Sequence, residues 1–275
     1  METVRIYSEN ATYQMFEVLK TNRNKRYKYK SFFVEGVRNI NLAVKNGWRI
    51  QSFLCSFERE LSGWAAELLE STPTELNYEL TAPLMAKLSG KTDMSELLAI
   101  VNMRPEAADL PNLPGNPLLL LFDRPSNKGN LGTLMRSCDG FGVDGLIITG
   151  HAVDIYDPEV IVSSMGSFFN VPFVRLADNA EIGRFVGDLK LRCPSLQIIG
   201  TTSHKKVNIY EVDMSGPTLL LVGNEADGLN RRLYEISDAL ATIPMSAHSY
   251  ASSFNVSCAA TVMLYEALRQ RNGGR

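Results

Sequence analysis

The sequence predicts an α/β protein in two parts, a small α/β domain followed by a larger domain built on a parallel sheet. Short apolar runs alternate with helical patterns along the chain, and a proline-rich stretch, residues 105–117, separates the two parts. The apolar runs after that stretch are continuous, which is typical of parallel strands covered on both faces.

Composition is that of a globular chain, with 275 residues, 45% hydrophobic and 21% charged, and it allows two buried cores. No signal pattern opens the chain, and no apolar run approaches the roughly 18 residues of a membrane helix, so we expect a cytoplasmic protein. The cysteines are widely spaced and form no Cys-x-x-Cys pair: Cys55, Cys138, Cys193 and Cys258. They predict buried, reduced thiols and no metal site.

The first part begins with a basic extension, residues 1–30, and continues as a substrate-binding domain over residues 31–104. Its expected strands are 31–34, 49–55, 76–80 and 96–103. Helical patterns fall between them at 37–45, 60–70 and 83–88. Residues 105–117 contain four prolines, a composition that neither a helix nor a central strand accepts, and we assign them as the linker.

Positive charge is concentrated near the amino terminus, although the net charge is −2. Between Val18 and Val34 the chain has six basic residues and no acidic one, with Tyr27 and Tyr29 among them. This pattern predicts contacts with an RNA backbone, or equally a solvated surface segment anchored by its aromatic residues. The candidate RNA-binding residues are Arg23, Lys25, Arg26, Lys28 and Lys30.

The second part, residues 118–275, predicts a doubly wound parallel sheet. Its expected strands are 118–122, 145–149, 196–201, 218–222 and 241–243. Helical patterns cover 131–140, 180–190 and 256–271. The final helix is small and apolar over most of its circumference, which indicates burial against another surface, with a second copy of the chain as one candidate.

Three polar segments follow predicted strands, where open α/β sheets bind their ligands. The first runs from Asp123 to Arg136, and its backbone N–H groups and arginine suit a phosphate. The second is 219–229, and the third is Ile243-Pro-Met245 with 252–257. Each alone is more typical of a turn or helix cap than of a ligand site. Neither the dinucleotide fingerprint nor the Walker pattern occurs.

In order and spacing, the three segments resemble the signature motifs of the SpoU/TrmH family of SPOUT methyltransferases. These are Asn-x-Gly-Asn-x-Gly-x-x-x-Arg, Gly-Asn-Glu-x-x-Gly-Leu, and Ile-Pro-Met followed by Ser-Leu-Asn-Val-Ser. The likeness spans about residues 118–271, and the first part resembles the ribosomal-protein-like RNA-binding domain that precedes many such domains. Phe254 stands where leucine is usual, and residues 246–252 form a longer stretch than is typical.

The resemblance implies a carboxyl-terminal trefoil knot, a homodimer, and transfer of methyl from S-adenosylmethionine to a ribose 2′-hydroxyl of RNA. The sulfonium of this cofactor supplies the electrophile, and the protein supplies position and electrostatics. Backbone groups of the knot loops bind the cofactor in the family. This maps here to Gly223, Ile243 and Phe254, with Asn224 and Met245 beside them.

The first-motif arginine, Arg136, is the main catalytic candidate by this resemblance. Because arginine rarely loses its proton, we expect it to hold the neighbouring phosphate and stabilise developing alkoxide rather than act as a base. Asn130 would orient the ribose or the arginine. Glu225, Ser253 and Asn255 would hold the loops and bond the substrate.

The separate amino-terminal domain favours ribosomal RNA, most of all 23S rRNA, in housekeeping modification or antibiotic self-resistance. A transfer RNA 2′-O-methyltransferase and a non-catalytic RNA-binding protein on the same fold are the alternatives. Amine- or base-directed methyltransferases lack this motif set, and a nicotinamide dehydrogenase would need the glycine fingerprint that is absent.

Overall fold

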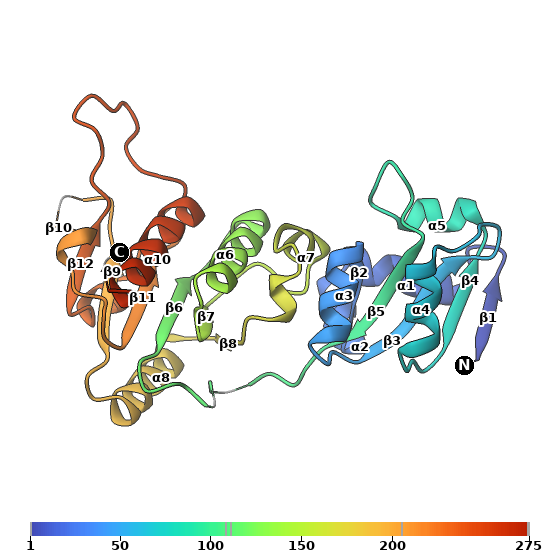
Figure 1. Ribbon diagram of the computed structural model, residues 1–275, viewed down its shortest axis with the longest axis horizontal. Helices are drawn as coiled ribbons and strands as arrows, with labels where there is room; N and C mark the ends of the chain where they lie inside the picture. The colour runs from blue at the N-terminus through green and yellow to red at the C-terminus, as the bar shows by residue number, and fades with distance from the viewer. Residues whose placement is uncertain (1, 108, 111, 205, 274–275) are drawn as a thin grey trace. The chain divides into compact units, whose positions relative to one another are not determined.

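The computed structural model describes residues 2–107, 109–110, 112–204 and 206–273. The chain divides into two compact units (Figure 1). The first unit comprises Met1–Pro105 together with Asp154–Asn170, and the second comprises Glu106–Val153 and Val171–Arg275. A segment from the middle of the second part of the sequence therefore packs with the first unit.

The first unit is built on a mixed five-stranded sheet in the order β1-β4-β3-β5-β2. Strand β5 is antiparallel to β2 and β3, whereas β4 is parallel to β1 and β3. The strands are β1 (Thr3–Ile6), β2 (Ser31–Glu35), β3 (Ile50–Ser56), β4 (Asn77–Leu80) and β5 (Leu97–Asn102). The helices are α1 (Ala11–Thr21), α2 (Arg23–Tyr29), α3 (Val37–Lys45), α4 (Gly63–Ser71), α5 (Ala82–Leu88), α7 (Pro158–Ser163) and the 3₁₀ turn η1 (Ser167–Phe169).

Most of the segment expected as an extension, residues 1–30, forms regular structure in β1, α1 and α2. Asn10 caps α1 by accepting from the backbone N–H of Tyr13 at 3.0 Å. Tyr13, Phe16 and Leu19 of α1 are fully buried and pack with residues of the sheet and of α5. This apolar spacing of three residues is a helical signal that lies just ahead of the basic segment.

An aromatic cluster fixes Asp154–Asn170 in the first unit. Phe32 of β2 and Trp48 lie against Phe168 and Phe169, with ring centroids 5.3 to 6.3 Å apart. The Trp48 indole donates to the Phe169 carbonyl at 3.0 Å. Because these rings are buried, the unit completes its core with residues far from it in sequence.

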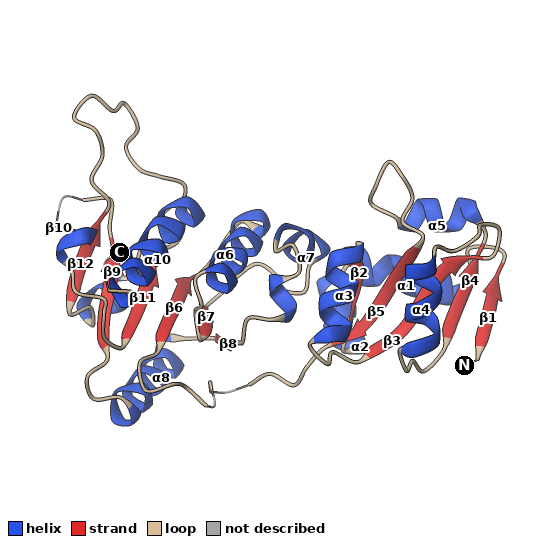
Figure 2. Cartoon of the chain, in the orientation of Figure 1, coloured by secondary structure: helices blue, strands red, loops and turns tan. Residues whose placement is uncertain are grey.

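The second unit contains a seven-stranded, wholly parallel sheet in the order β10-β12-β9-β11-β6-β7-β8. Figure 2 shows its strands alternating with helices. The strands are β6 (Leu118–Asp123), β7 (Gly145–Thr149), β8 (Phe173–Leu176), β9 (Gln197–Thr201), β10 (Val207–Asn208), β11 (Thr218–Val222) and β12 (Ala239–Thr242). The helices are α6 (Lys128–Gly140), α8 (Asn179–Arg192), the 3₁₀ turn η2 (Ile209–Glu211), α9 (Arg231–Glu235) and α10 (Val256–Arg271).

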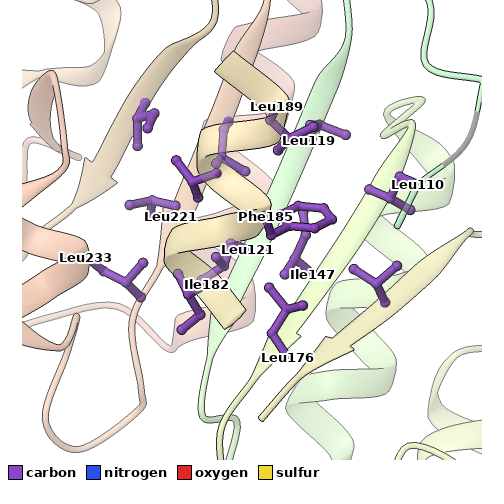
Figure 3. Close-up of a cluster of buried hydrophobic side chains, with 14 of the residues drawn as sticks. Leu110, Leu119, Leu121, Ile147, Leu176, Ile182, Phe185, Leu189, Leu221 and Leu233 are labelled. Atoms are coloured by element: carbon purple, nitrogen blue, oxygen red, sulfur yellow. The ribbon is translucent and has the colours of Figure 1, made fainter. Parts of the chain in front are cut away.

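The core of this unit confirms the parallel sheet predicted from continuous apolar runs. Side chains that alternate along the strands point toward α8, including Leu119 and Leu121 of β6 (Figure 3). Ile182, Phe185 and Leu189 of α8 cover them. The intervening Leu118, Leu120 and Phe122 are also buried, so both faces of the sheet are covered.

Part of the stretch expected as a linker packs into the second unit. Leu110 is buried in its core beside Gly145, and Asp109 pairs with Arg192 at 3.0 Å. A side chain at position 145 would occupy the space that Leu110 fills. Residues 108 and 111 of this stretch lie outside the described residues.

All four cysteines were predicted to be buried, and for two of them the prediction is wrong. Cys55 and Cys138 are buried, and burial raises the pKa of the Cys55 thiol to about 11. Cys193 is half-buried and Cys258 is exposed, because Cys258 lies on an uncovered side of α10. All four are free thiols.

The final helix, α10, has the predicted bounds and packs on α6. The hydroxyls of Ser137 and Thr261 are 2.6 Å apart, and Phe141 contacts Tyr265 edge-on. Burial is incomplete, because Val262 and Tyr265 are 45% and 56% exposed. None of the helices in the described ranges has the length and apolar character of a membrane span.

Candidate active site

The three predicted polar segments follow β6, β11 and β12 at the carboxyl edge of the parallel sheet. Strand β6 ends at Asp123, β11 at Val222 and β12 at Thr242. Because all strands of this sheet are parallel, their carboxyl ends meet at one edge. The segments are therefore close in space although about 130 residues separate Asp123 from Asn255 in sequence.

Helix α6, the first helix of the site, begins with an asparagine cap. The side chain of Asn127 accepts from the backbone N–H of Asn130 at 2.8 Å, and the helix begins at Lys128. This cap sets the first turn of α6, and with it the position of the Asn130 side chain.

Glu225 holds the start of α6 against the turn that follows β11. One carboxylate oxygen accepts from the backbone N–H and hydroxyl of Ser126 at 3.0 and 2.7 Å. The other accepts from the Asn127 backbone N–H and the Asn130 amide, both at 3.2 Å. Burial opposes ionisation of Glu225, but these hydrogen bonds outweigh it and lower the pKa of Glu225. The carboxylate is thus an ionised acceptor of four bonds.

Asn130 connects Glu225 and the start of α6 to the third segment. Its carbonyl oxygen accepts from the Asn255 amide at 3.1 Å. Asn255 in turn caps α10, since its side-chain oxygen accepts from the backbone N–H of Ser257 at 3.0 Å and of Cys258 at 3.3 Å. Glu225, Asn130 and Asn255 form one chain of hydrogen bonds across the three segments.

The predicted cofactor residues follow β11 and β12. At Gly223 a side chain would overlap the backbone of Gly228, because Asn224 and Gly228 bond each other through both backbone groups at 2.9 and 3.0 Å. Ile243 and Met245 are half-buried beyond β12, and Phe254 is 46% exposed before α10. The glycine is required by a tight turn, and the apolar side chains are accessible.

Two predicted catalytic residues lie outside the hydrogen-bonded chain. Arg136 is exposed on α6, and its guanidinium makes no hydrogen bond or ion pair with the described part of the chain. Ser253 is exposed in the loop before α10. The same helix carries Asn130 and Arg136, so both are attached to one rigid element.

Four residues that shape this edge were given no individual role from the sequence, although three of them lie in the first polar segment. Ser126 and Asn127 supply donors to Glu225, while Asp123 and Asn230 bond each other beneath the turn. The asparagine before a helical run was a recognisable cap signal. The partner of a buried aspartate at a strand end carries no local sequence signal.

The predicted RNA-binding set needs one correction, at Arg26. Its side chain is 1% exposed, and its guanidinium pairs with Asp154 at 2.7 Å and Asp157 at 3.1 Å. It also donates to the Leu19 and Lys20 carbonyls. A guanidinium with these partners is not available to a phosphate, so Arg26 is structural.

The remaining basic residues of the set lie on α2 and at its end. Arg23 and Lys28 are exposed, Lys25 is half-buried, and Lys30 is an exposed helix cap with φ of 52°. Lys28 lies over the ring of Tyr29, which is 42% exposed. These residues keep the alternation of cation and aromatic ring that suits a nucleic-acid strand.

In the described ranges, histidine, cysteine, aspartate and glutamate side chains form no group of three or more that could hold a metal ion.

Both parts of the chain match models of known protein families. Residues 117–265 match the SpoU rRNA Methylase family model, and residues 10–99 match the SpoU L30e-like domain. The chain therefore belongs to the SpoU rRNA methylase family, which confirms the resemblance drawn from the three motifs.

The individual relatives are similar over nearly the whole chain. A 23S rRNA (uridine(2479)-2′-O)-methyltransferase of Streptomyces viridochromogenes is 41% identical over 98% of this chain and 94% of its own. The crystal structure of the SpoU methyltransferase AviRb from that organism, in complex with the cofactor AdoMet, matches with TM-score 0.90 and 40% identity over 97% of this chain and 100% of its own. An AdoMet-bound rRNA methyltransferase of Sinorhizobium meliloti matches with TM-score 0.82 and 26% identity over 98% of both chains.

Proposed function

We propose that this protein transfers a methyl group from S-adenosylmethionine to a ribose 2′-hydroxyl of 23S ribosomal RNA. The observation that carries the proposal is the chain of hydrogen bonds from Glu225 through Asn130 to Asn255. These hydrogen bonds join the three motif segments at the carboxyl edge of the sheet. The polypeptide belongs to the SpoU family, which has these motifs. The near-full-length relative from S. viridochromogenes acts on 23S rRNA, which supports this choice of RNA.

The residues at this edge fit S-adenosylmethionine, which has an aromatic base, a cationic sulfonium and polar ends. Met245 and Phe254 offer accessible apolar side chains, and the turn after Gly223 offers main-chain groups. Gly223, Asn224, Ile243, Met245 and Phe254 would hold the cofactor. When bound, it supplies the electrophilic methyl group.

Arg136 has the role of stabilising charge on the substrate. Its guanidinium is exposed and permanently charged, and it can bond a backbone phosphate and the developing ribose alkoxide together. Asn130, fixed by Glu225 and Asn255, orients the ribose relative to α6. Ser253, exposed on the adjoining loop, can donate to the same nucleotide. Asn130 is held by hydrogen bonds on both sides, and a preorganised group favours the transition state because it need not reorganise during the reaction.

RNA affinity comes from α2 in this proposal. Arg23, Lys25, Lys28 and Lys30 neutralise backbone phosphates, and Tyr29 offers a stacking surface. The residues that contact the backbone lie in the first unit, and the residues proposed for chemistry lie in the second.

Three further features stay predictions of the family resemblance. A trefoil knot is supported by the strand order, in which β12 lies between β9 and β10. A homodimer is supported by the exposed Val262 and Tyr265 on α10, and a monomer in sedimentation at micromolar concentration would contradict it. Action on ribosomal RNA would place the protein in the cytoplasm.

The experiment is incubation of the purified protein with labelled S-adenosylmethionine and either 23S rRNA or transfer RNA, followed by digestion to nucleosides. We expect label in a 2′-O-methylated nucleoside from 23S rRNA. Label in a methylated base would identify a base-directed enzyme, and label in transfer RNA alone would move the substrate to that class. RNA binding without transfer would indicate a non-catalytic RNA-binding protein.

A further inference from the structure

Asp123, at the carboxyl end of β6, is a fully buried carboxylate that the proposed chemistry does not use. It accepts from the Thr149 hydroxyl at 2.8 Å, from the Asn230 backbone N–H at 3.0 Å and from the Asn230 amide at 3.1 Å. The side chain of Arg124 adds an ion pair at 3.0 Å. One carboxylate thus connects the ends of β6 and β7 to the residue that follows the turn after β11.

Arg124 is one of the few non-glycine residues with left-handed backbone, at φ of 48°. This conformation is unfavourable for a residue with a side chain, so its neighbours must hold it. Its carbonyl accepts from the Asn224 amide at 2.7 Å, and its guanidinium lies 3.8 Å from the Asp227 carboxylate. The left-handed backbone at Arg124 therefore points its carbonyl toward Asn224, in the turn that follows β11.

The turn from Gly223 to Asn230 is consequently held at its beginning, middle and end. Asn224 bonds the Arg124 carbonyl, Asp227 lies near the Arg124 guanidinium, and Asn230 bonds Asp123. Between these points Glu225 reaches across to the start of α6. A turn held in this way has one position relative to the ends of the strands.

We propose that Asp123 and Arg124 are positioning residues for the cofactor site. The inference rests on the proposed function, because it takes the turn after Gly223 as part of that site. Replacing Asp123 with asparagine removes the charge that Arg124 pairs with and turns one of the two acceptor oxygens into an NH2 group. One Asn230 donor then loses its acceptor, and the turn shifts. Arg136 is on another element, so binding of cofactor suffers more than the transfer step.

The test compares Asp123→Asn with Asp144→Asn by calorimetric titration with S-adenosylmethionine. Asp144 is the matched control, because its carboxylate accepts from the Leu118 backbone N–H at 2.8 Å at the opposite end of β6. We expect Asp123→Asn to weaken cofactor binding about tenfold or more, since a hydrogen bond to a charged group is worth at least that factor. Its kcat at saturating cofactor should fall less than its cofactor affinity does, because the same turn reaches the start of α6 only through Glu225. Asp144→Asn should bind as the wild type does.

A second readout needs no ligand. In the free protein, amide hydrogen exchange over residues 223–230 should accelerate in Asp123→Asn and stay unchanged in Asp144→Asn. If Asp123→Asn does not fold, Arg124→Ala, whose side chain is 35% exposed, takes its place with the same expectations. A wild type that binds no S-adenosylmethionine would overturn the proposed function, while exchange would still decide this inference. Unchanged exchange and unchanged affinity in a folded variant would overturn it.

Discussion

Glu225 is the residue on which the geometry of the site depends most. Its two carboxylate oxygens accept four hydrogen bonds from the segment Ser126–Asn130. A charged acceptor of four hydrogen bonds is costly to replace, because hydrogen bonds to a charged group are stronger than those between neutral groups. The geometry of the α6 start therefore depends on one side chain of the turn after β11.

Glu225→Gln should destabilise the protein in a pH-dependent manner. The folded pKa of Glu225 is lowered, so its stabilisation is present above the unfolded pKa of about 4.3 and is lost as pH falls through the folded value. The amide also presents N–H groups to the donors of Ser126 and Asn127. We expect the difference in Tm between wild type and variant to be largest near neutral pH and to shrink on acidification. A difference that grows toward low pH would contradict this.

Arg136→Ala should abolish methyl transfer and leave cofactor binding nearly intact. The exposed guanidinium lies on α6, whereas the proposed cofactor residues follow β11 and β12. Loss of one donor that stabilises developing negative charge lowers kcat by about 100- to 1,000-fold. Calorimetric titration with S-adenosylmethionine provides the comparison. Loss of cofactor affinity equal to the loss of activity would remove Arg136 from the catalytic role.

Arg26→Ala should destabilise the protein by about 3 to 5 kcal/mol, because it leaves the buried Asp154 carboxylate without the cation that pairs with it. Lys28→Ala, on the exposed side of the same helix, should cost at most about 0.5 kcal/mol. Denaturant unfolding of the two variants measures the contrast. Similar stabilities would show that the Arg26 ion pairs add nothing to the fold.

At the scale of elements, α2 illustrates what composition predicts and what it omits. The run of basic residues predicted a charged surface, and Arg23, Lys28 and Lys30 are exposed. Composition did not indicate that one of the arginines turns inward, because its acceptors, Asp154 and Asp157, are more than 120 residues away in sequence. Long-range ion pairs leave no local pattern.

Replacing Arg23, Lys25 and Lys28 together with alanine should raise the KM for RNA and flatten its dependence on salt. Fewer neutralised phosphates release fewer counterions, while the transfer step on α6 is unaffected. Lys45, Arg49 and Arg59, exposed basic residues of the same unit, provide a matched triple alanine control. A collapse of the rate at saturating RNA, with RNA affinity preserved, would show that α2 takes part in assembling the active site.

The strands of the second unit were predictable where the sequence is continuously apolar. The bounds of β7 and β11 agree with the prediction to the residue, because both strands are buried along their whole length. Strands β8 and β10 at the sheet edges were missed, since they are short and only partly buried. An edge strand lacks the pattern of a strand covered on both faces.

For the whole molecule, the order of the three polar motifs along the sequence predicted the site best. The segments after β6, β11 and β12 were expected to meet, and the hydrogen bonds of Asn130 connect all three. The sequence could not show that Asp154–Asn170 completes the core of the first unit. That assignment depends on aromatic contacts, such as Trp48 with Phe169, between positions 121 residues apart.

The most direct test of the account is alkaline hydrolysis of 23S rRNA after treatment with the wild type or with Arg136→Ala. A methylated 2′-oxygen cannot attack the adjacent phosphodiester, so the modified position resists cleavage. We predict one protected position that requires both S-adenosylmethionine and Arg136. Methyl incorporation with no protected position would contradict ribose methylation, and protection by Arg136→Ala equal to that by the wild type would contradict the proposed site.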